Sequence, residues 1–238
     1  MRNNISIMLY KIFKNIRKAY DYLLLLCFPD KCVYCGKKNE LFCELCIAKT
    51  RHPERDLPKN VYAACDYRDP QIKNALLFLK YYKKARLGSI LGKILYERLL
   101  EDISDIRIYT RGAPIILVPA PLSKKRLKER GYNQALIIAL GFREAAQINI
   151  ENPIFEIIDD LVIKSKDTKP QAKIKNRKER LTNLKDCFMI NPKNKYDLSG
   201  RTVIVIDDIT TTGSTLSEIM SVLEDSGAKK VVGFAVAH

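Results

Sequence analysis

The sequence predicts an α/β fold, a doubly wound parallel sheet preceded by a small cysteine-containing module and an N-terminal amphipathic helix. Three observations support this prediction. From about residue 61 onward, short apolar runs typical of buried strands alternate with segments of helical periodicity. One of these runs, at 203–206, ends in two adjacent aspartates and a hydroxyl-rich turn. Four cysteines lie close together before the alternating pattern begins. At 238 residues, the chain can form one α/β domain and a small additional module.

The N-terminal segment has an apolar helical face, and its basic residues lie largely off that face. We therefore expect an amphipathic helix over residues 1–26, which packs on the protein or on a partner in preference to a membrane surface. The segment is too charged to span a bilayer and lacks the small-residue cleavage site of a secretion signal, so the expected location is the cytoplasm. The cysteine module follows at 27–50, a charged linker with Pro53 and Pro58 at 51–60, and the α/β domain at 61–238.

The α/β domain is expected to contain at least five strands. They are predicted at 61–67, 115–118, 161–164, 203–206 and 231–236. Helices are predicted at 72–79, at 87–100, at 135–146 and after residue 213. The charged stretch 101–105 is expected to end the second helix, and the basic segment 166–178 is expected to have little regular structure.

Four of the seven cysteines form two Cys-x-x-Cys pairs joined by a short loop. They are Cys32, Cys35, Cys43 and Cys46. This spacing is typical of a structural zinc site with four thiolate ligands. A pair of disulfides is the competing interpretation, and a reducing cytoplasm argues against it. Cys27 is close enough in sequence to be a spare ligand, whereas His52 is interpreted as an incidental surface residue.

The residues after the 203–206 run have the chemistry of a sugar-phosphate site. Asp207 and Asp208 are acceptors when ionised, so they suit the vicinal hydroxyls of a ribose. The turn that follows opens a helix, whose first amides and positive end can hold a phosphate. The expected phosphate loop consists of Thr210, Thr211, Thr212, Gly213, Ser214 and Thr215. A solvated helix-capping pair of aspartates is the alternative.

Residues 203–215, VIVIDDITTTGST, resemble the phosphoribosyl-pyrophosphate (PRPP) signature of type I phosphoribosyltransferases. Two further segments are similar to motifs of the ComF family. One is VPAPLSKKRLKERGYNQA at 118–135, and the other is the set Gln171, Arg180, Asn183 and Phe188. That family also carries a cysteine-rich zinc module at its N-terminus. The resemblance extends from about residue 25 to the C-terminus, with the motifs in the family's order.

The resemblance implies roles for residues outside the acidic pair. It assigns the pyrophosphate of PRPP to a rigid loop containing Ser123, Lys124, Arg126 and Arg130. It assigns a closing lid to a lysine-rich segment with Gln171, Arg180 and Asn183. Mg²⁺ would accompany PRPP, bridging pyrophosphate and ribose oxygens. If displacement at the anomeric carbon occurs, Asp208 is the nearest candidate for a general base.

Three functions are compatible with the sequence. The resemblance implies a protein of DNA uptake that binds PRPP or a related ligand, with single-stranded DNA and a competence helicase as partners. The net charge of +15 is compatible with such polyanionic ligands. The second is an active phosphoribosyltransferase with an unknown acceptor, against whose base Tyr132 could stack. The third is an adaptor in which the zinc module and the amphipathic helix dock a partner, and which PRPP regulates.

Overall fold

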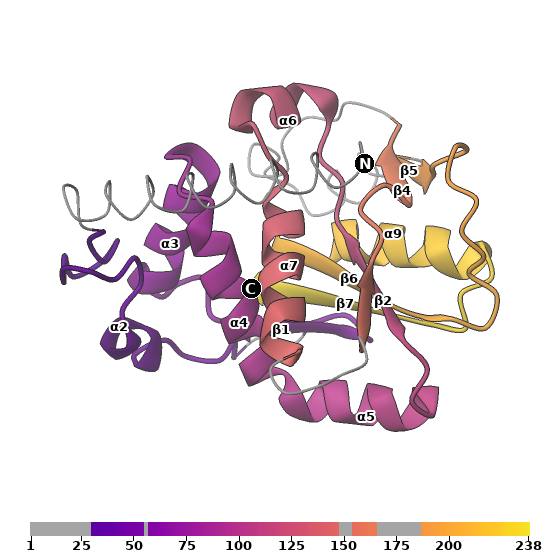
Figure 1. Cartoon of the computed structure of the whole chain (residues 1–238), viewed down its shortest axis with the longest axis horizontal. Helices are drawn as coiled ribbons and strands as arrows, with labels where there is room; N and C mark the ends of the chain where they lie inside the picture. Colours follow the sequence, from indigo (N-terminus) through magenta and orange to yellow (C-terminus); the bar gives the residue numbers. More distant parts are fainter. Residues whose placement is uncertain (1–29, 55–56, 148–153, 166–186) are drawn as a thin grey trace, which may run out of the picture.

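The structure is a computed structural model that describes residues 30–54, 57–147, 154–165 and 187–238 (Figure 1). The predicted amphipathic helix, Cys27 and the three predicted lid residues lie outside these ranges. None of the described helices is long and apolar enough to cross a membrane.

The centre of the molecule is a five-stranded sheet with the order β1-β7-β6-β2-β3 (Figure 1). Its strands are β1 (Val61–Cys65), β2 (Ile115–Pro119), β3 (Phe155–Ile157), β6 (Thr202–Ile209) and β7 (Lys230–Ala237). Every neighbouring pair is parallel. The predicted parallel α/β fold is therefore confirmed, and the carboxyl ends of all five strands lie at one edge of the sheet.

Helices connect the strands and cover both faces of the sheet (Figure 1). They are α3 (Pro70–Tyr81), α4 (Arg86–Arg98), α5 (Leu100–Thr110), α6 (Lys124–Arg130), α7 (Gln134–Ala146) and α9 (Ser214–Asp225), and α2 (Glu44–Ala48) belongs to the cysteine module. Helices α4 and α7 cross closely because glycines remove side chains at the contact. A Cβ on Gly92 would lie 2.1 Å from the Ile138 carbonyl oxygen.

Strand β6 is buried on both faces because consecutive side chains alternate between two hydrophobic cores. Ile204 and Ile206 belong to the core that includes α3, α4 and α7. Val203 and Val205 belong to the core that includes α9. This alternation continues into the acidic pair, which prolongs the strand. Asp208 follows the face of Ile204 and Ile206, and Asp207 follows the opposite face.

Two predictions about the strands were incomplete. The run at 161–164 does form a strand, β4 (Val162–Lys164), but it pairs antiparallel with β5 (Phe188–Ile190) in a separate two-stranded sheet. The fifth strand of the main sheet is β3, which was not predicted. It has only three residues, and exposed Glu156 interrupts its apolar pattern. Such a short segment gains its strand conformation from pairing with β2.

The second predicted helix does end before the charged stretch 101–105, since α4 ends at Arg98, but the stretch itself lies in a further helix that was not predicted. A new helix, α5, begins at Leu100 and continues to Thr110. Its charged residues face solvent, while Ile103 and Ile106, three positions apart, are buried in the core. A three-residue spacing places both side chains on one face of a helix, which explains why the charges do not interrupt it.

Candidate functional site

The acidic pair lies near the C-terminal end of strand β6, at the carboxyl edge of the sheet. Asp208 is 9% exposed, and its Oδ1 lies 3.0 Å from the Nζ of Lys80 on α3. Asp207 folds back on the chain, where its Oδ1 accepts a hydrogen bond of 2.8 Å from the Asp208 amide. The strand continues through both residues to Ile209, instead of ending before them as predicted. Pairing with β7 therefore holds the backbone of both aspartates in place.

The pKa of Asp207 lies well above the ordinary value of an aspartate. Burial is the largest cause that raises the pKa of Asp207, and the adjacent charge of Asp208 raises it further, to about 7. The hydrogen bond from the Asp208 amide and the charges of Lys80 and Arg130 act in the opposite direction. The ionised form of Asp207 is the one that accepts hydrogen bonds from two hydroxyl groups, so its acceptor capacity increases through neutral pH.

The turn between β6 and α9 combines a left-handed glycine with hydroxyl side chains. Gly213 has φ +75° and is the N-cap residue of α9. The hydroxyls of Thr212 and Ser214 are hydrogen-bonded to each other, and the Ser214 amide lies 3.4 Å from the Thr212 Oγ1. Thr211 is exposed, and Thr215 is partly exposed. The first turn of a helix with twelve residues therefore opens directly beside these hydroxyls, as in sites that bind phosphate.

Thr210 differs from the other residues of the predicted phosphate loop. Its side chain is 4% exposed, and its amide donates to the Ala237 carbonyl of β7 at 2.9 Å. The Thr210 carbonyl oxygen is also 3.2 Å from a ring nitrogen of His238. Thr210 thus ties the end of β6 to the end of β7, and the residues that present accessible donors begin at Thr211.

The basic segment after β2 was expected to be a loop, but residues 124–130 form helix α6. Ser123 is its N-cap, with the side chain accepting from the Arg126 amide at 3.4 Å. Gly131, at φ +82°, ends the helix. Both capping residues are visible in the sequence, so the signal for a helix was present. Lys124 is exposed and Arg126 is partly exposed, which leaves their charged groups accessible to a ligand.

Arg130, the last predicted pyrophosphate residue, is fixed by two neighbours. Its guanidinium donates to Oε1 of Gln134 at 2.7 Å and lies 5.9 Å from the ring centroid of Tyr81. Tyr81 follows Lys80 at the end of α3, so α3 and α6 meet beside the acidic pair. Tyr132, predicted as a residue that could stack on a base, donates its hydroxyl to the Leu79 carbonyl and packs against the core.

Lys80 is the main residue of this site that the sequence did not reveal. Its side chain is 17% exposed, which is unusually low for lysine. The sequence places it in an apolar helix before two tyrosines and two more lysines, where a solvent-facing charge is the ordinary expectation. Only the packing of α3 against the edge of the sheet brings it to Asp208.

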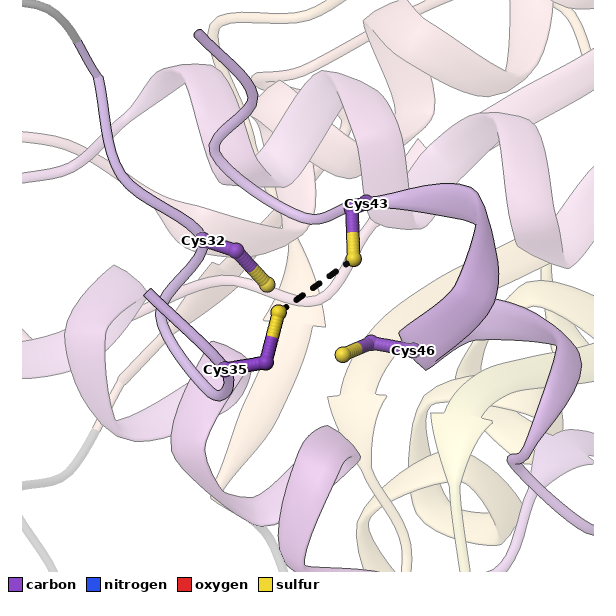
Figure 2. A group of neighbouring side chains, drawn as sticks. All are labelled: Cys32, Cys35, Cys43 and Cys46. Atoms are coloured by element: carbon purple, nitrogen blue, oxygen red, sulfur yellow. Dashed lines mark hydrogen bonds between the residues drawn. The ribbon is translucent and has the colours of Figure 1, made fainter. Parts of the chain in front are cut away.

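The four predicted metal ligands converge at one point, as Figure 2 shows. The sulfur atoms of Cys32, Cys35, Cys43 and Cys46 all lie within 4.8 Å of one another. Sulfurs around a tetrahedral zinc ion are about 3.8 Å apart, so the cluster fits such an ion after small side-chain adjustments. The Sγ atoms of Cys35 and Cys43 are 3.6 Å apart, and all six described cysteines are free thiols. The structure therefore contains no disulfide among its described residues.

Local backbone geometry presents these thiols to one another. The Gly36 amide donates to the Cys32 carbonyl at 3.0 Å, and Gly36 has φ +75°, which closes a tight turn between the first two cysteines. Burial acts to raise the pKa of Cys32, but hydrogen bonds from neighbouring amides, those of Cys35 and Cys43 foremost, lower it to about 6. Amide donors that favour a thiolate are suited to a metal ligand. His52 is exposed and is not part of the cluster.

Two cavities lie at opposite ends of the strands. A cavity of about 140 Å³ borders Thr210, Thr211 and His238 at the carboxyl edge. A larger one, about 380 Å³, is lined by Arg201, Lys229 and the residues that precede β2, at the amino edge. The larger cavity is thus remote from the acidic pair, and the candidate site is identified by its side chains rather than by cavity size.

Several known proteins are similar to this chain. Residues 138–238 match the model of the phosphoribosyl transferase domain. Competence protein F of Haemophilus influenzae is 26% identical over 207 residues, which cover 87% of this chain and 84% of that protein. Competence protein ComFC of Bacillus subtilis is 34% identical over 122 residues, which cover 51% of this chain and 43% of that protein. The chain is thus similar to proteins of the ComF family.

The DNA utilization protein YhgH of Escherichia coli is also similar to this chain over most of its length. It is 26% identical over 203 residues, which cover 84% of this chain and 80% of that protein. The match to the phosphoribosyl transferase model begins within α7 and takes in β6, α9 and β7. It therefore includes the acidic pair and the turn at Gly213, whereas α6 and the cysteine module precede it.

Solved structures with a related fold include hypoxanthine phosphoribosyltransferases. The Trypanosoma cruzi enzyme has 11% sequence identity and a TM-score of 0.37, covering 62% of this chain and 65% of that chain. The Staphylococcus aureus enzyme has 14% identity and a TM-score of 0.33, covering 62% of this chain and 61% of that chain. The fold assignment of this chain rests on its own strand order and on the match to the phosphoribosyl transferase domain.

Proposed function

We propose that this chain is a ComF-family protein that binds PRPP, or a related phosphoribosyl ligand, at the carboxyl edge of its sheet and acts in DNA uptake. The observation that carries the proposal is the placement of the acidic pair, partly exposed Asp207 and buried Asp208, directly before the turn at Gly213 and the start of α9. Acceptors for sugar hydroxyls and donors for a phosphate are thereby a few residues apart on one rigid strand–turn–helix unit.

The parts of the ligand are assigned by their chemistry. Asp207 and Asp208 accept hydrogen bonds from the ribose hydroxyls, and the residues from Thr211 to Thr215 hold the 5′-phosphate. The pyrophosphate meets the N-terminus and cations of α6, contributed by Ser123, Lys124, Arg126 and Arg130. Mg²⁺ would neutralise part of the pyrophosphate charge. Zinc, bound by the four clustered cysteines, would stabilise the fold of the N-terminal module.

The role in DNA uptake is supported by the names of the relatives, competence protein F, ComFC and a DNA utilization protein. The net charge of +15 is compatible with contact to single-stranded DNA, and a competence helicase in the cytoplasm is the proposed protein partner. Direct contact requires that the chain bind single-stranded DNA at low salt, with an affinity that falls steeply as salt is added. Absence of binding at low salt would eliminate this contact.

An active phosphoribosyltransferase is the second candidate, because the acidic pair, the phosphate turn and the cationic helix are all intact. The reaction would displace pyrophosphate from the anomeric carbon by an acceptor nucleophile, whose proton Asp208 would take up. Release of pyrophosphate in the presence of bases and amines tests this candidate. No release with any acceptor, under conditions where PRPP binds, would leave binding as the function of the site.

Calorimetric titration of PRPP with Mg²⁺ tests the proposed function. The wild-type protein should bind, and the double variant Asp207→Asn/Asp208→Asn should not. The chain provides a matched control in Asp159 and Asp160, an adjacent acidic pair that is exposed. The corresponding double variant of that pair has the same change in net charge and should bind as the wild type does. Failure of the wild type to bind PRPP would refute the proposal.

A further inference from the structure

Lys80 reaches the acidic pair from a part of the chain far from the PRPP-like signature. Its amine lies 3.0 Å from the Asp208 Oδ1, and the two side chains are only 17% and 12% exposed. It is located in the last turn of α3, where the helix packs beside the end of β6. Ion pairs this well shielded are costly to form unless both groups have further partners. An ammonium group has three donors, and Asp208 occupies one.

A second cation, Arg130, acts on the acidic pair. The charge of Arg130 acts on Asp207 together with that of Lys80. Arg130 is held by Gln134, which is 1% exposed, and lies over the ring of Tyr81, the neighbour of Lys80. The end of α3 and the end of α6 therefore place two positive charges beside carboxylates that suit a sugar diol. A sugar alone has no anionic group that would require them.

We propose that Lys80 recognises the pyrophosphate at C1 of the ligand, and so makes the site select pyrophosphorylated 5-phosphoribose over 5-phosphoribose alone. The inference rests on the proposed function. The reason is the connectivity of the sugar: the C2 hydroxyl that binds a carboxylate is on the carbon next to C1. A cation in contact with Asp208 is consequently within reach of a substituent on C1, and the donors that Asp208 does not occupy can bind anionic oxygens. In this role Lys80 of α3 determines ligand specificity, in addition to the cations of α6 that are proposed to bind the pyrophosphate.

The competing explanation is that Lys80 only neutralises Asp208. The two roles differ in which ligand the lysine affects. A purely structural lysine supports the carboxylate that binds ribose, so its loss weakens every ligand that uses the ribose hydroxyls. A lysine that contacts pyrophosphate affects only the ligand that carries this group.

The test is calorimetry of Lys80→Met with two ligands, PRPP and ribose 5-phosphate, each with Mg²⁺. We expect PRPP to bind roughly tenfold or more weakly, as for loss of a hydrogen bond to a charged group, while ribose 5-phosphate binds about as it does to the wild type. Lys73→Met is the matched control, since Lys73 is on the same helix and exposed. It should leave both affinities unchanged. Lys80→Arg keeps the charge and should restore part of the PRPP affinity.

Equal weakening of both ligands, or no change in either, would overturn the proposed role of Lys80 while leaving the phosphoribosyl site intact. Failure of the wild type to bind either ligand would instead refute the function itself. If Lys80→Met does not fold, which circular dichroism would show, Lys80→Gln replaces it, because its amide retains hydrogen-bond donors near Asp208 without the charge.

Discussion

Replacement of Gly213 by alanine is expected to destabilise the protein through two separable effects. The first is conformational: Gly213 has φ +75°, and a left-handed residue with a Cβ costs roughly 1–2 kcal/mol. The second is steric: the new Cβ would lie 2.5 Å from Cγ and 2.9 Å from Cδ of Pro58 in the linker. A proline ring cannot rotate out of the way, and overpacking of this kind costs about 1–3 kcal/mol. The expected total is about 2–5 kcal/mol of unfolding free energy.

Gly200 is the matched control for this substitution. It has φ +72°, and no atom lies within 4 Å of the position of its Cβ, so Gly200→Ala should lose only the conformational part, about 1–2 kcal/mol. Unfolding by urea, followed by circular dichroism, measures both losses. Pro58→Ala should recover much of the excess loss in the Gly213→Ala background, as a double-mutant cycle. Equal losses for the two glycines would show that the linker does not pack against the turn at Gly213.

Three further predictions concern the acidic pair, the cysteine module and its attachment. The folded state raises the pKa of Asp207 from 3.8 to about 7, so the contribution of this residue to the unfolding free energy falls as the pH rises through that range. Asp207→Asn should remove this decline, and above neutral pH the variant should be more stable than the wild type in urea unfolding. Arg98 donates from Nη2 to the carbonyl and hydroxyl oxygens of Thr50, at 3.0 and 2.6 Å, so Arg98→Met should lower the unfolding free energy by about 2–4 kcal/mol, and a loss within error would contradict this. Purified protein should contain one zinc ion per chain by elemental analysis, which Cys32→Ser removes and Cys187→Ser does not; a metal-free wild type would contradict the assignment.

The core of the fold and the acidic turn could be predicted because their signals are local. The run of β-branched residues before Asp207 is typical of a strand that is buried on both faces of a parallel sheet, and Gly213 indicates the turn before a helix. The same explanation applies to the two Cys-x-x-Cys pairs. Each pair lies within a single turn of the chain, and only the contact between the two pairs depends on tertiary structure. In these cases short-range spacing limits the geometry so strongly that sequence and structure agree.

The features that escaped prediction depend on contacts between distant segments. Strand β3 has three residues and forms because β2 offers it a partner. The β4 run is apolar enough for the main sheet, yet its partner is β5, so its sheet could not be inferred from its composition. Lys80 is the clearest example, since its partner Asp208 lies 128 positions further along the chain. No local sequence pattern indicates that these two residues are in contact.

The alternation of β6 explains why the candidate site involves both faces of the sheet. Since neighbouring side chains in a strand point to opposite sides, Asp207 and Asp208 are continuous with different hydrophobic cores. The core with α3 and α4 sets the position of Lys80 against Asp208, while the core with α9 sets the turn that follows Asp207. Lys80 and the turn at Gly213 are therefore positioned by separate packing interactions, one on each face of β6. Substitutions that loosen α3 against the sheet should consequently weaken recognition of pyrophosphate before they affect the 5′-phosphate, and those that loosen α9 should do the reverse.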